Sequence, residues 1–460
     1  MQSLLAIARL TSKAAFRFRL TPLMGALLIG CAVLLPVAIK SDGTARGMTQ
    51  IVLAYTLTLT TALLGMTTLW LACGTLAKDI EECRIQLVDV KPVPRWKVWL
   101  GKWLGILKID LTLLALAAGV VYVELQWRAS KLPPDQQEIL RNEVFVARGS
   151  FKPPQPDIEA EVDKLYQQRL QQEPALKAMD PKEVRRALRA RVLSEYEAVP
   201  PGWTRRWRID MSSVKDKVRG LHLFLRIKFH AAERKPKQTY IGEWRVGPPE
   251  SPLRFRDIKS QAPDTYHEFA VPPGLLDDKG FLTIEFSNPN ETALLFPLDD
   301  GIEVLYREGG FLLNYVRGVT ILFFWLALLA ALGLASASYL SFPTAAFVSL
   351  SLLIVAFSTG TMRTVIEQGS ILGVNPETGR VDNPGLVGMV SVAFFKTLLF
   401  LVNLVRGFSP IDSLSTGRSV SWGALARAAA QIVLLMGGFL AAVGIAVFTR
   451  RELATAQGRG

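Results

Sequence analysis

Long uninterrupted apolar runs are the feature that most limits how this chain can fold. They lie in its two end regions, and each has roughly 18–25 residues, enough for a helix rising 1.5 Å per residue to cross a ~30 Å hydrocarbon core. Of the residues, 50% are hydrophobic and 20% are charged. This pattern predicts an α-helical polytopic membrane protein and excludes a cytosolic enzyme or a secreted domain. The six transmembrane helices that we predict cover residues 22–39, 50–75, 99–124, 312–340, 343–361 and 424–448.

The net charge of +13 is concentrated beside the membrane and not in the soluble middle of the chain. Residues 125–310 contain 30 Lys and Arg against 28 Asp and Glu, whereas the two membrane blocks contain 23 against 12. Basic segments next to apolar helices follow from anionic headgroups and from the rule that positive loops stay inside. We therefore expect membrane lipid, and no nucleic acid, as the partner of these charges.

The short basic segments also predict the orientation. The first 20 residues carry four positive charges and no acid, the 77–97 loop carries five positive charges, and Arg450 and Arg451 follow the last span. Six spans with both termini cytoplasmic place all of these inside. We expect a multi-pass protein of the inner (cytoplasmic) membrane with residues 125–310 extracytoplasmic. The N-terminal segment is either an interfacial amphipathic helix or an ordinary basic flank.

One further apolar run is ambiguous. Residues 386–405 nearly reach span length and contain a single charge, Lys396. A seventh span would move Arg450 and Arg451 to the outer face, against the charge rule. We therefore expect residues 365–420 to form a re-entrant segment on the outer side, although 386–405 could also span.

The region between the third and fourth spans predicts an inserted α+β domain. Over 125–202, Val184, Leu188, Val192 and Tyr196 recur at helical spacing, and a second helix over 157–172 completes a helical hairpin. Over 203–310 the apolar period changes to two, as in LHLFLRIKF, and turn residues separate about seven short strands. This spacing predicts an antiparallel β-sandwich of jelly-roll type. Its ligand stays open: a partner protein, a lipid or a glycan, unless the sandwich is only a spacer.

Motifs that carry chemistry are absent from the sequence. The cysteines Cys31, Cys73 and Cys83 lie in or beside apolar runs, and the three histidines form no HExxH and no paired Cys/His spacing. No GxxxxGK[ST] motif occurs that would cradle nucleotide phosphates. We expect no catalytic, metal or cofactor site on this chain, and hence no enzyme.

The segment between the second and third spans, TLAKDIEECRIQLVDVKPVPRWKVWLGKWLGILK, is the most informative stretch. Two acids, Glu81 and Glu82, end the second span, and Pro92 and Pro94 turn the chain back before the third. We expect a short helix parallel to the membrane, with Trp96 and Trp99 at the headgroup level. Such an element is suited to receive force from a cytoplasmic partner.

Three motifs carry a family resemblance: the acidic pair, the run L..VKPVPR..VWLGKWLG, and the closing AVFTRREL. In this order across the spans they resemble the type-2 ABC transporter permeases, over about residues 1–125 and 311–460. The resemblance implies that 77–97 is the coupling helix, which docks on a separate nucleotide-binding ATPase subunit. It assigns the ATPase-facing surface to Glu81, Glu82, Arg84, Pro92, Pro94 and Arg95, with Lys102 beside it. The alternative is a solvated loop that only sets topology.

The resemblance also implies partners and domain limits. The permease would be the membrane half of an exporter, paired with an identical or a related permease, with ATP and Mg²⁺ bound by the ATPase and not by this chain. The 186-residue outer domain departs from compact exporters of the family. It resembles the layout of lipopolysaccharide-exporter permeases without a sequence match, which leaves the substrate and the direction open. The expected domains are 1–124, 125–202, 203–310 and 311–460.

Two charges inside the third span are further candidates. Lys108 and Asp110 lie about two turns from the start of the span, and ionisable groups at that depth are costly enough to be functional candidates. They are two residues apart on a helix and so face different directions. Either Lys108 snorkels and Asp110 meets another span, or Asp110 faces a translocation route. A rival to transport is a sensor or assembly scaffold whose outer domain binds a partner protein, lipid or glycan.

Overall fold

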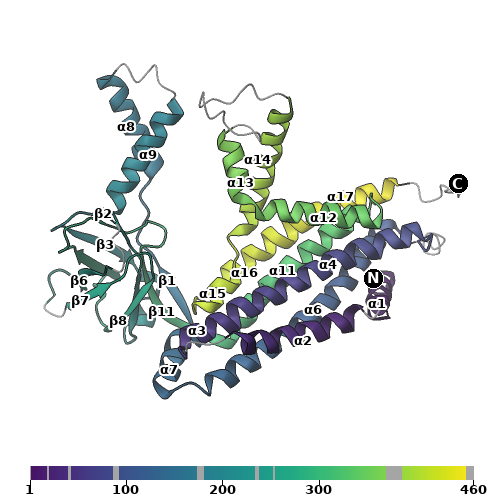
Figure 1. Ribbon diagram of the computed structural model, residues 1–460, viewed down its shortest axis with the longest axis horizontal. Helices are drawn as coiled ribbons and strands as arrows, with labels where there is room; N and C mark the ends of the chain where they lie inside the picture. Colours follow the sequence, from purple (N-terminus) through teal and green to yellow (C-terminus); the bar gives the residue numbers. More distant parts are fainter. Residues whose placement is uncertain are drawn as a thin grey trace. The chain divides into compact units, whose positions relative to one another are not determined.

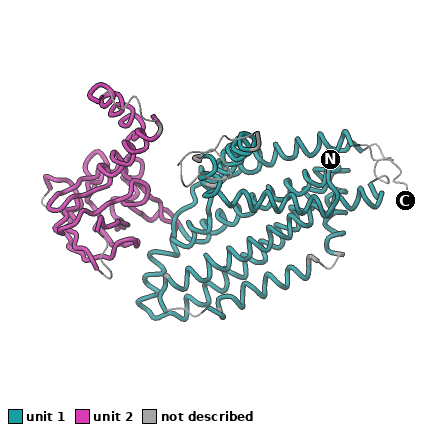
Figure 2. Tube along the Cα trace, turned by 45° about the horizontal axis from the view of Figure 1, so that its top comes forward, with its two compact units in different colours: residues 1–146, 310–460 teal, residues 147–309 magenta. Residues whose placement is uncertain are grey.

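The computed structural model describes residues 2–17, 20–39, 43–85, 93–173, 181–233, 238–251, 254–368 and 386–451. The chain divides into two compact units, and Figure 2 draws them in different colours. The first unit comprises residues 1–146 and 310–460 and is helical. The second comprises residues 147–309 and is rich in β-strands.

The helical unit contains the apolar runs of the sequence (Figure 1). Before the insertion its helices are α1 (Gln2–Arg17), α2 (Leu20–Ala38), α3 (Ala45–Thr49), the π-helical turn η1 (Gln50–Tyr55), α4 (Thr56–Glu81), α6 (Arg95–Ala129), α7 (Pro134–Ile139) and η2 (Leu140–Val144). After it they are α11 (Phe311–Ala337), α12 (Phe342–Phe357), α13 (Thr359–Gln368), α14 (Leu386–Arg406), α15 (Pro410–Ser415), α16 (Trp422–Ala428), the π-helical η5 (Ala429–Gly437) and α17 (Gly438–Arg450).

Four of these helical stretches are long and apolar enough to cross a membrane, and a fifth qualifies if α12 and α13, bent by 72° at their junction, form one span. This count applies to the described residues. The four are Gly47–Glu81, Arg95–Ala129, Phe311–Ala337 and Trp422–Arg450. The protein is therefore a multi-span helical membrane protein with a β-rich insertion. The fifth predicted span, 343–361, falls on the bent pair, and the first, 22–39, falls on α2, whose apolar part Pro22–Pro36 is shorter than a span.

The ambiguous run 386–405 forms α14, and its apolar part, Gly388–Leu404, is again shorter than a span. Residues 369–385, which would connect α13 to α14, lie outside the described residues. The expected re-entrant segment over 365–420 therefore stays a prediction.

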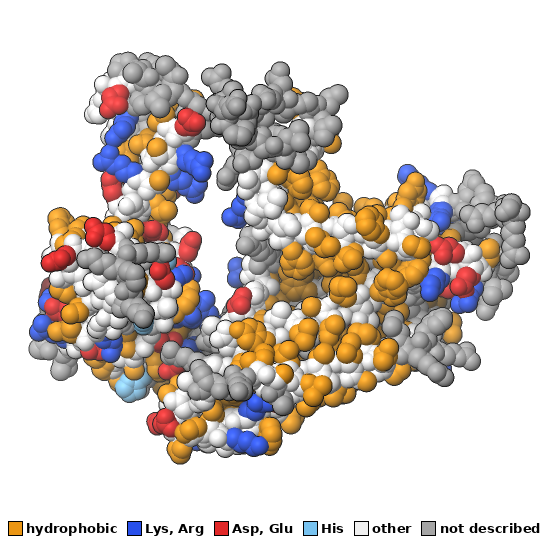
Figure 3. Space-filling view, in the orientation of Figure 1, with side chains coloured by type: hydrophobic (Ala, Val, Ile, Leu, Met, Phe, Trp, Pro, Cys, Tyr) orange, Lys and Arg blue, Asp and Glu red, His pale blue; other side chains and the backbone are white. Residues whose placement is uncertain are grey.

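Helix α11 is the centre of the helical unit and packs against α4, α6, α12 and α17. Its contact with α4 is close, because a Cβ placed at Gly333 would lie 2.7 Å from the Cβ of Ala72. Small residues at such positions let membrane helices approach each other. Away from these contacts, hydrophobic side chains cover the visible face of the helical unit, whereas charged side chains gather on the β-rich unit (Figure 3).

The second unit contains the strands β1 (Val146–Phe151), β2 (Ala198–Val199), β3 (Thr204–Asp210), β4 (Leu223–Ile227), β5 (His230–Ala231), β6 (Tyr240–Val246), β7 (Phe255–Gln261), β8 (His267–Val271), β9 (Phe281–Ser287), β10 (Leu294–Leu295) and β11 (Ile302–Gly310). Its helices are α8 (Ile158–Gln172), α9 (Pro181–Glu197), η4 (Ser212–Val214) and α10 (Lys215–Val218).

Two four-stranded sheets form the body of this unit, in the orders β1-β11-β4-β8 and β3-β9-β6-β7, with a small third sheet β2-β10-β5. As the chain advances it passes repeatedly from one large sheet to the other, which is the strand order of a jelly roll. The period of two is visible in β4, where Leu223, Leu225 and Ile227 are buried and the residues between them are partly exposed. Leu221, which we expected in the same inward row, precedes the strand and is exposed.

The helical hairpin joins the jelly roll through β2. Helices α8 and α9 pack against each other through a cluster of five buried side chains. The side chain of Asp157 accepts a hydrogen bond of 3.1 Å from the backbone N–H of Ala160 and so caps α8. The buried residues of the cluster are Val162, Tyr166, Val184, Leu188 and Val192.

An aromatic cluster fills the jelly roll, and we expect it to dominate the stability of this unit. Trp244 is fully buried, and its ring centroid lies 4.7 Å from that of Phe286. Replacing Trp244 with Ala would leave a cavity costing about 3–5 kcal/mol of unfolding free energy. The measurement is the urea dependence of tryptic cleavage within residues 203–310 of the full-length protein. The matched control is Trp203→Ala, which removes a side chain that is 67% exposed and should change stability by about 0.5 kcal/mol or less.

Candidate functional site

The sequence directs attention to the connection between α4 and α6. Helix α4 ends at Glu81, and Cys83 then adopts a positive φ of 59° as the chain leaves the helix. Helix α6 begins at Arg95, immediately after Pro94, whose fixed φ of −63° suits the position before a first helical turn. Residues 86–92, which include the predicted contact residue Pro92, lie outside the described residues.

Glu81 caps another membrane helix. Its Oε1 accepts a hydrogen bond of 2.8 Å from the backbone N–H of Phe342, the first residue of α12. Ser341, which precedes α12, makes no capping hydrogen bond with its side chain. A helix N-terminus has unsatisfied N–H groups and a partial positive charge, so the Glu81 carboxylate stabilises it. This contact ties the end of α4 to the start of α12.

Arg95 caps the C-terminal end of α17, as Glu81 caps the N-terminal end of α12. Its Nη1 donates to the backbone carbonyl oxygens of Phe448 (3.1 Å), Thr449 (3.0 Å) and Arg451 (2.7 Å). The last carbonyls of a helix lack partners within the helix, and a cation there also complements the helix dipole. Arg451 in turn donates through Nη1 to the carbonyl oxygen of Ser338, 3.1 Å away, just after α11.

Lys102 connects α6 back to α4. Its Nζ forms an ion pair with the carboxylate of Asp79 and donates a hydrogen bond of 2.9 Å to the carbonyl oxygen of Thr75. The lysine side chain is only 6% exposed, whereas that of Asp79 is 33% exposed. A buried ammonium is tolerated when it is paired in this way. We call the set Asp79, Glu81, Arg95, Lys102 and Arg451 the helix junction.

The remaining two predicted contact residues lie on the surface. Glu82 and Arg84 form an ion pair with each other, and their side chains are 46% and 57% exposed. Such a pair contributes little to stability, about 0–1 kcal/mol. Of the predicted ATPase-facing residues, the structure thus places Glu81, Arg95 and Lys102 in contacts within the chain. Glu82 and Arg84 are left available to a partner.

Two further features complete the junction. Helix α1 crosses the start of α6, where a Cβ at Gly105 would lie 2.6 Å from the Cβ of Thr11 and only glycine leaves enough room. Trp99 is fully buried and donates from Nε1 to Oγ of Ser338 at 3.3 Å. Trp99 is therefore covered by other helices, whereas Trp96 is 44% exposed, and the expected place of both at the headgroup level stays a prediction. Helices α11 and α17 cover the face of α6 that carries Trp99.

The two charges deeper in α6 separate as their spacing predicts. Lys108 is exposed on the outer surface of α6. Asp110 is 2% exposed, and its Oδ1 accepts a hydrogen bond of 2.8 Å from Oγ1 of Thr68 on α4. Its Oδ2 has no hydrogen-bond partner among the described residues. Asp110 thus contacts α4, and one of its carboxylate oxygens remains for a further ligand or proton. The snorkelling of Lys108 and the translocation route stay predictions.

Sequence reasoning missed Asp79 and Arg451 as parts of the junction. A signal for Asp79 existed: a carboxylate near the end of one span and an ammonium near the start of the next lie close when the two helices are antiparallel neighbours. For Arg451 no such signal existed, because its partner carbonyl belongs to a residue more than one hundred positions away. Among the described residues no group of three His, Cys, Asp or Glu side chains could hold a metal ion.

Comparisons with known proteins add no family. No protein-family model matches the chain, and neither the curated proteins nor the solved structures give a match. A functional assignment therefore depends on the residues and contacts described above.

We expect the loss of one charge of the ion pair Asp79–Lys102 to destabilise the protein more than the loss of both. Asp79→Leu leaves a buried ammonium without its counter-charge and should lower the unfolding free energy by about 3–5 kcal/mol. Adding Lys102→Met removes the remaining charge and should restore most of the loss, because apolar residues often replace a buried ion pair at little cost. The measurement is the midpoint of thermal unfolding of the detergent-solubilised protein.

The exposed ion pair Glu82–Arg84 provides the control for these Asp79 and Lys102 variants. Glu82→Gln should shift the free energy by at most about 1 kcal/mol. A double variant as unstable as Asp79→Leu alone would contradict the pairing.

Proposed function

We propose that this chain is the membrane-spanning permease subunit of an ABC-type transporter, an exporter driven by a separate ATPase subunit. The resemblance of the 77–97 segment to a coupling helix motivates the proposal. The observation that supports it best is the helix junction, in which side chains on both flanks of this segment hold α12 and α17. A push on the connection between α4 and α6 would move four membrane helices together.

In this proposal some residues of the segment dock on the ATPase and others transmit its movement to the membrane helices. Glu82 and Arg84, exposed and next to the residues 86–92, contact the ATPase. Glu81, Arg95 and Lys102 transmit the movement, because each links helix ends through a contact within the chain. ATP binding and hydrolysis on the ATPase shift the bundle between inward-facing and outward-facing states. Such coupling requires that each ligand prefers one of the two states.

The proposed topology has six spans and both termini in the cytoplasm. The first and fifth spans are α2 and the bent pair of α12 and α13, in addition to the four long helices. The junction, which includes Arg451, then faces the cytoplasm together with the other basic segments, as the positive-inside rule requires. Residues 125–310 lie outside. The permease pairs with a second copy or with a related chain.

The exposed pair offers a direct test of ATPase docking. Exchanging the two charges, Glu82→Arg with Arg84→Glu, preserves the ion pair within the chain but reverses the charges that a partner meets. If the pair contacts an ATPase, the exchange should reduce stimulated ATPase turnover about tenfold, since like charges placed across an interface are repulsive. The measurement is the turnover of an ATPase that co-purifies with this chain and contains a Walker A motif.

The outcomes of this test separate the two functions. Unchanged turnover in the exchanged variant would remove Glu82 and Arg84 from the docking surface. A stable complex in which the wild-type chain never stimulates turnover would favour a scaffold or sensor over a transporter.

The buried carboxylate offers a second test. If Asp110 faces the translocation route, Asp110→Asn removes the only charge on that face of α6 at this depth and should lower stimulated ATPase turnover by about tenfold, within the usual range of coupling energies. The matched control is Lys108→Gln, which removes a charge two residues away on the exposed surface and should leave turnover unchanged. Size-exclusion chromatography checks that both variants still assemble. Equal turnover in Asp110→Asn and the wild type would exclude Asp110 from the route.

A further inference from the structure

The inner row of strand β3 contains a residue that does not belong in a β-sandwich core. Register with β9 places Arg205, Trp207 and Ile209 on the same face of the strand, opposite Phe286, Ile284 and Leu282. Ile209 is fully buried, whereas Arg205 and Trp207 are partly exposed. The core is therefore open at the start of β3, and an arginine lines the opening.

A cavity of about 310 Å³ occupies this opening. The volume is at the low end of the range for small-molecule pockets, so it suits a single ring better than a long chain or a protein surface. Three segments surround β3 at the cavity: the loop Pro153–Pro156, the last turn of α9 with Tyr196, and the turn Phe296–Leu298. Trp207 packs edge-on against Phe296, with ring centroids 5.4 Å apart.

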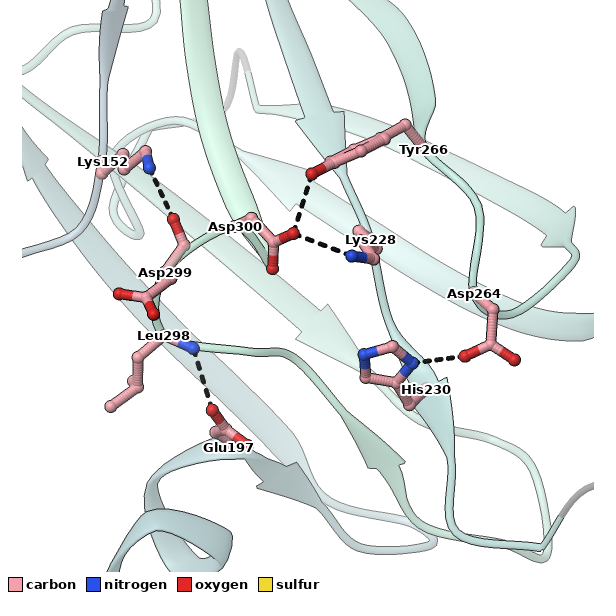
Figure 4. A network of polar contacts seen from close by, with 9 residues as sticks. All are labelled: Lys152, Glu197, Lys228, His230, Asp264, Tyr266, Leu298, Asp299 and Asp300. Atoms are coloured by element: carbon pink, nitrogen blue, oxygen red, sulfur yellow. Dashed lines mark hydrogen bonds and ion pairs between the residues drawn. The ribbon is translucent and has the colours of Figure 1, made fainter. Parts of the chain in front are cut away.

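Hydrogen bonds hold these walls in place (Figure 4). Lys152 donates from Nζ to the carbonyl oxygen of Asp299, and Gln155 donates from Nε2 to its Oδ1 at 3.1 Å. On the other side, Glu197 accepts through Oε1 from the backbone N–H of Leu298 at 3.1 Å. The pocket is therefore formed without a ligand, which lowers the entropic cost of binding one.

The polar atoms in the pocket include both donors and acceptors. Arg205 makes one hydrogen bond, from Nη1 to the carbonyl oxygen of Ala198 at 3.2 Å, which leaves most of its five N–H groups without a partner among the described residues. The Tyr196 hydroxyl and the Trp207 indole N–H likewise have no partner among the described residues, and they line the same cavity. A ligand that both donates and accepts hydrogen bonds would satisfy them.

The charges around the pocket balance. Burial has the largest influence on the pKa of Arg205 and lowers it, while the neighbouring Glu197 and Tyr196 act in the opposite direction. Arg205 is the one charged residue among those that line the pocket, and the carboxylate of Glu197 beside it offsets its charge. The pocket therefore has little net attraction for a charged headgroup. A neutral ligand with an apolar face and several hydroxyl groups fits this arrangement.

We propose that this pocket binds a neutral sugar ring of a glycan. The apolar C–H face of the ring stacks on the Trp207 indole, and Arg205 and Tyr196 bond to its hydroxyl groups. This binding does not depend on the ATPase coupling proposed above, so the two proposals can fail separately. The proposal gives the β-rich unit a binding site for a ligand, which the sequence left open.

The test uses the full-length protein in lipid nanodiscs. The probes are glucose, galactose, mannose, N-acetylglucosamine and their tetrasaccharides, immobilised on an array, with glucuronate as the charged counterpart and palmitate as an apolar anion. We expect at least one neutral sugar to bind, and the dissociation constant of that sugar is then measured by calorimetry. Binding of glucuronate or palmitate alone, or of no probe, would overturn the proposal.

Variants locate the site. Trp207→Ala should weaken binding about tenfold through loss of the stacking surface, and Tyr196→Phe about threefold through loss of one hydrogen bond. Tyr196→Phe keeps the ring and guards against an effect of misfolding in Trp207→Ala. The matched control is Trp203→Ala, in the same unit but outside the pocket, which should leave the dissociation constant unchanged. Wild-type affinity in both pocket variants would place the sugar elsewhere and overturn the assignment.

Discussion

Backbone groups at the ends of membrane helices need hydrogen-bond partners. In the helical unit this requirement accounts for the contacts that Glu81 and Arg95 make. A helix cannot satisfy its own terminal N–H and C=O groups, so side chains of neighbouring helices can supply the partners. Here Glu81 satisfies the start of α12 and Arg95 satisfies the end of α17. Both residues belong to the helix ends that flank one connection. The position of that connection therefore fixes the positions of two other helices.

A side chain that moved to an external partner would give up such a contact. If Arg95 were to bind an external carboxylate in place of these carbonyl groups, the end of α17 would lose its donor. Docking and transmission therefore need different residues. In the proposed mechanism the exposed pair Glu82–Arg84 would meet the first need and the helix junction the second. This division would let a short segment with few residues serve both tasks.

The sequence predicts the fold better than it predicts the site. Long apolar runs and the change of period from 3.6 to two give the membrane helices, the helical hairpin and the jelly roll, because these patterns depend only on which face of an element is buried. The role of Glu81 was not predictable in this way, since its partner lies 261 residues away and the contact depends on how α4 and α12 pack. The burial of Trp99 was not predictable for the same reason: a tryptophan near a span end suits the headgroup region or a helix interface equally well.

The charge distribution differs between the two units. The excess of positive charge lies in the membrane blocks, where it would suit anionic headgroups, whereas residues 125–310 carry 30 basic against 28 acidic residues. The pocket beside Arg205 repeats this balance on a local scale, because Glu197 offsets the charge of Arg205. Had the β-rich unit evolved to hold an anionic lipid, an unpaired cluster of Lys and Arg would be the expected signature. The balanced charges and the aromatic wall instead favour recognition by stacking and hydrogen bonds, which changes little with salt concentration because it depends little on long-range attraction.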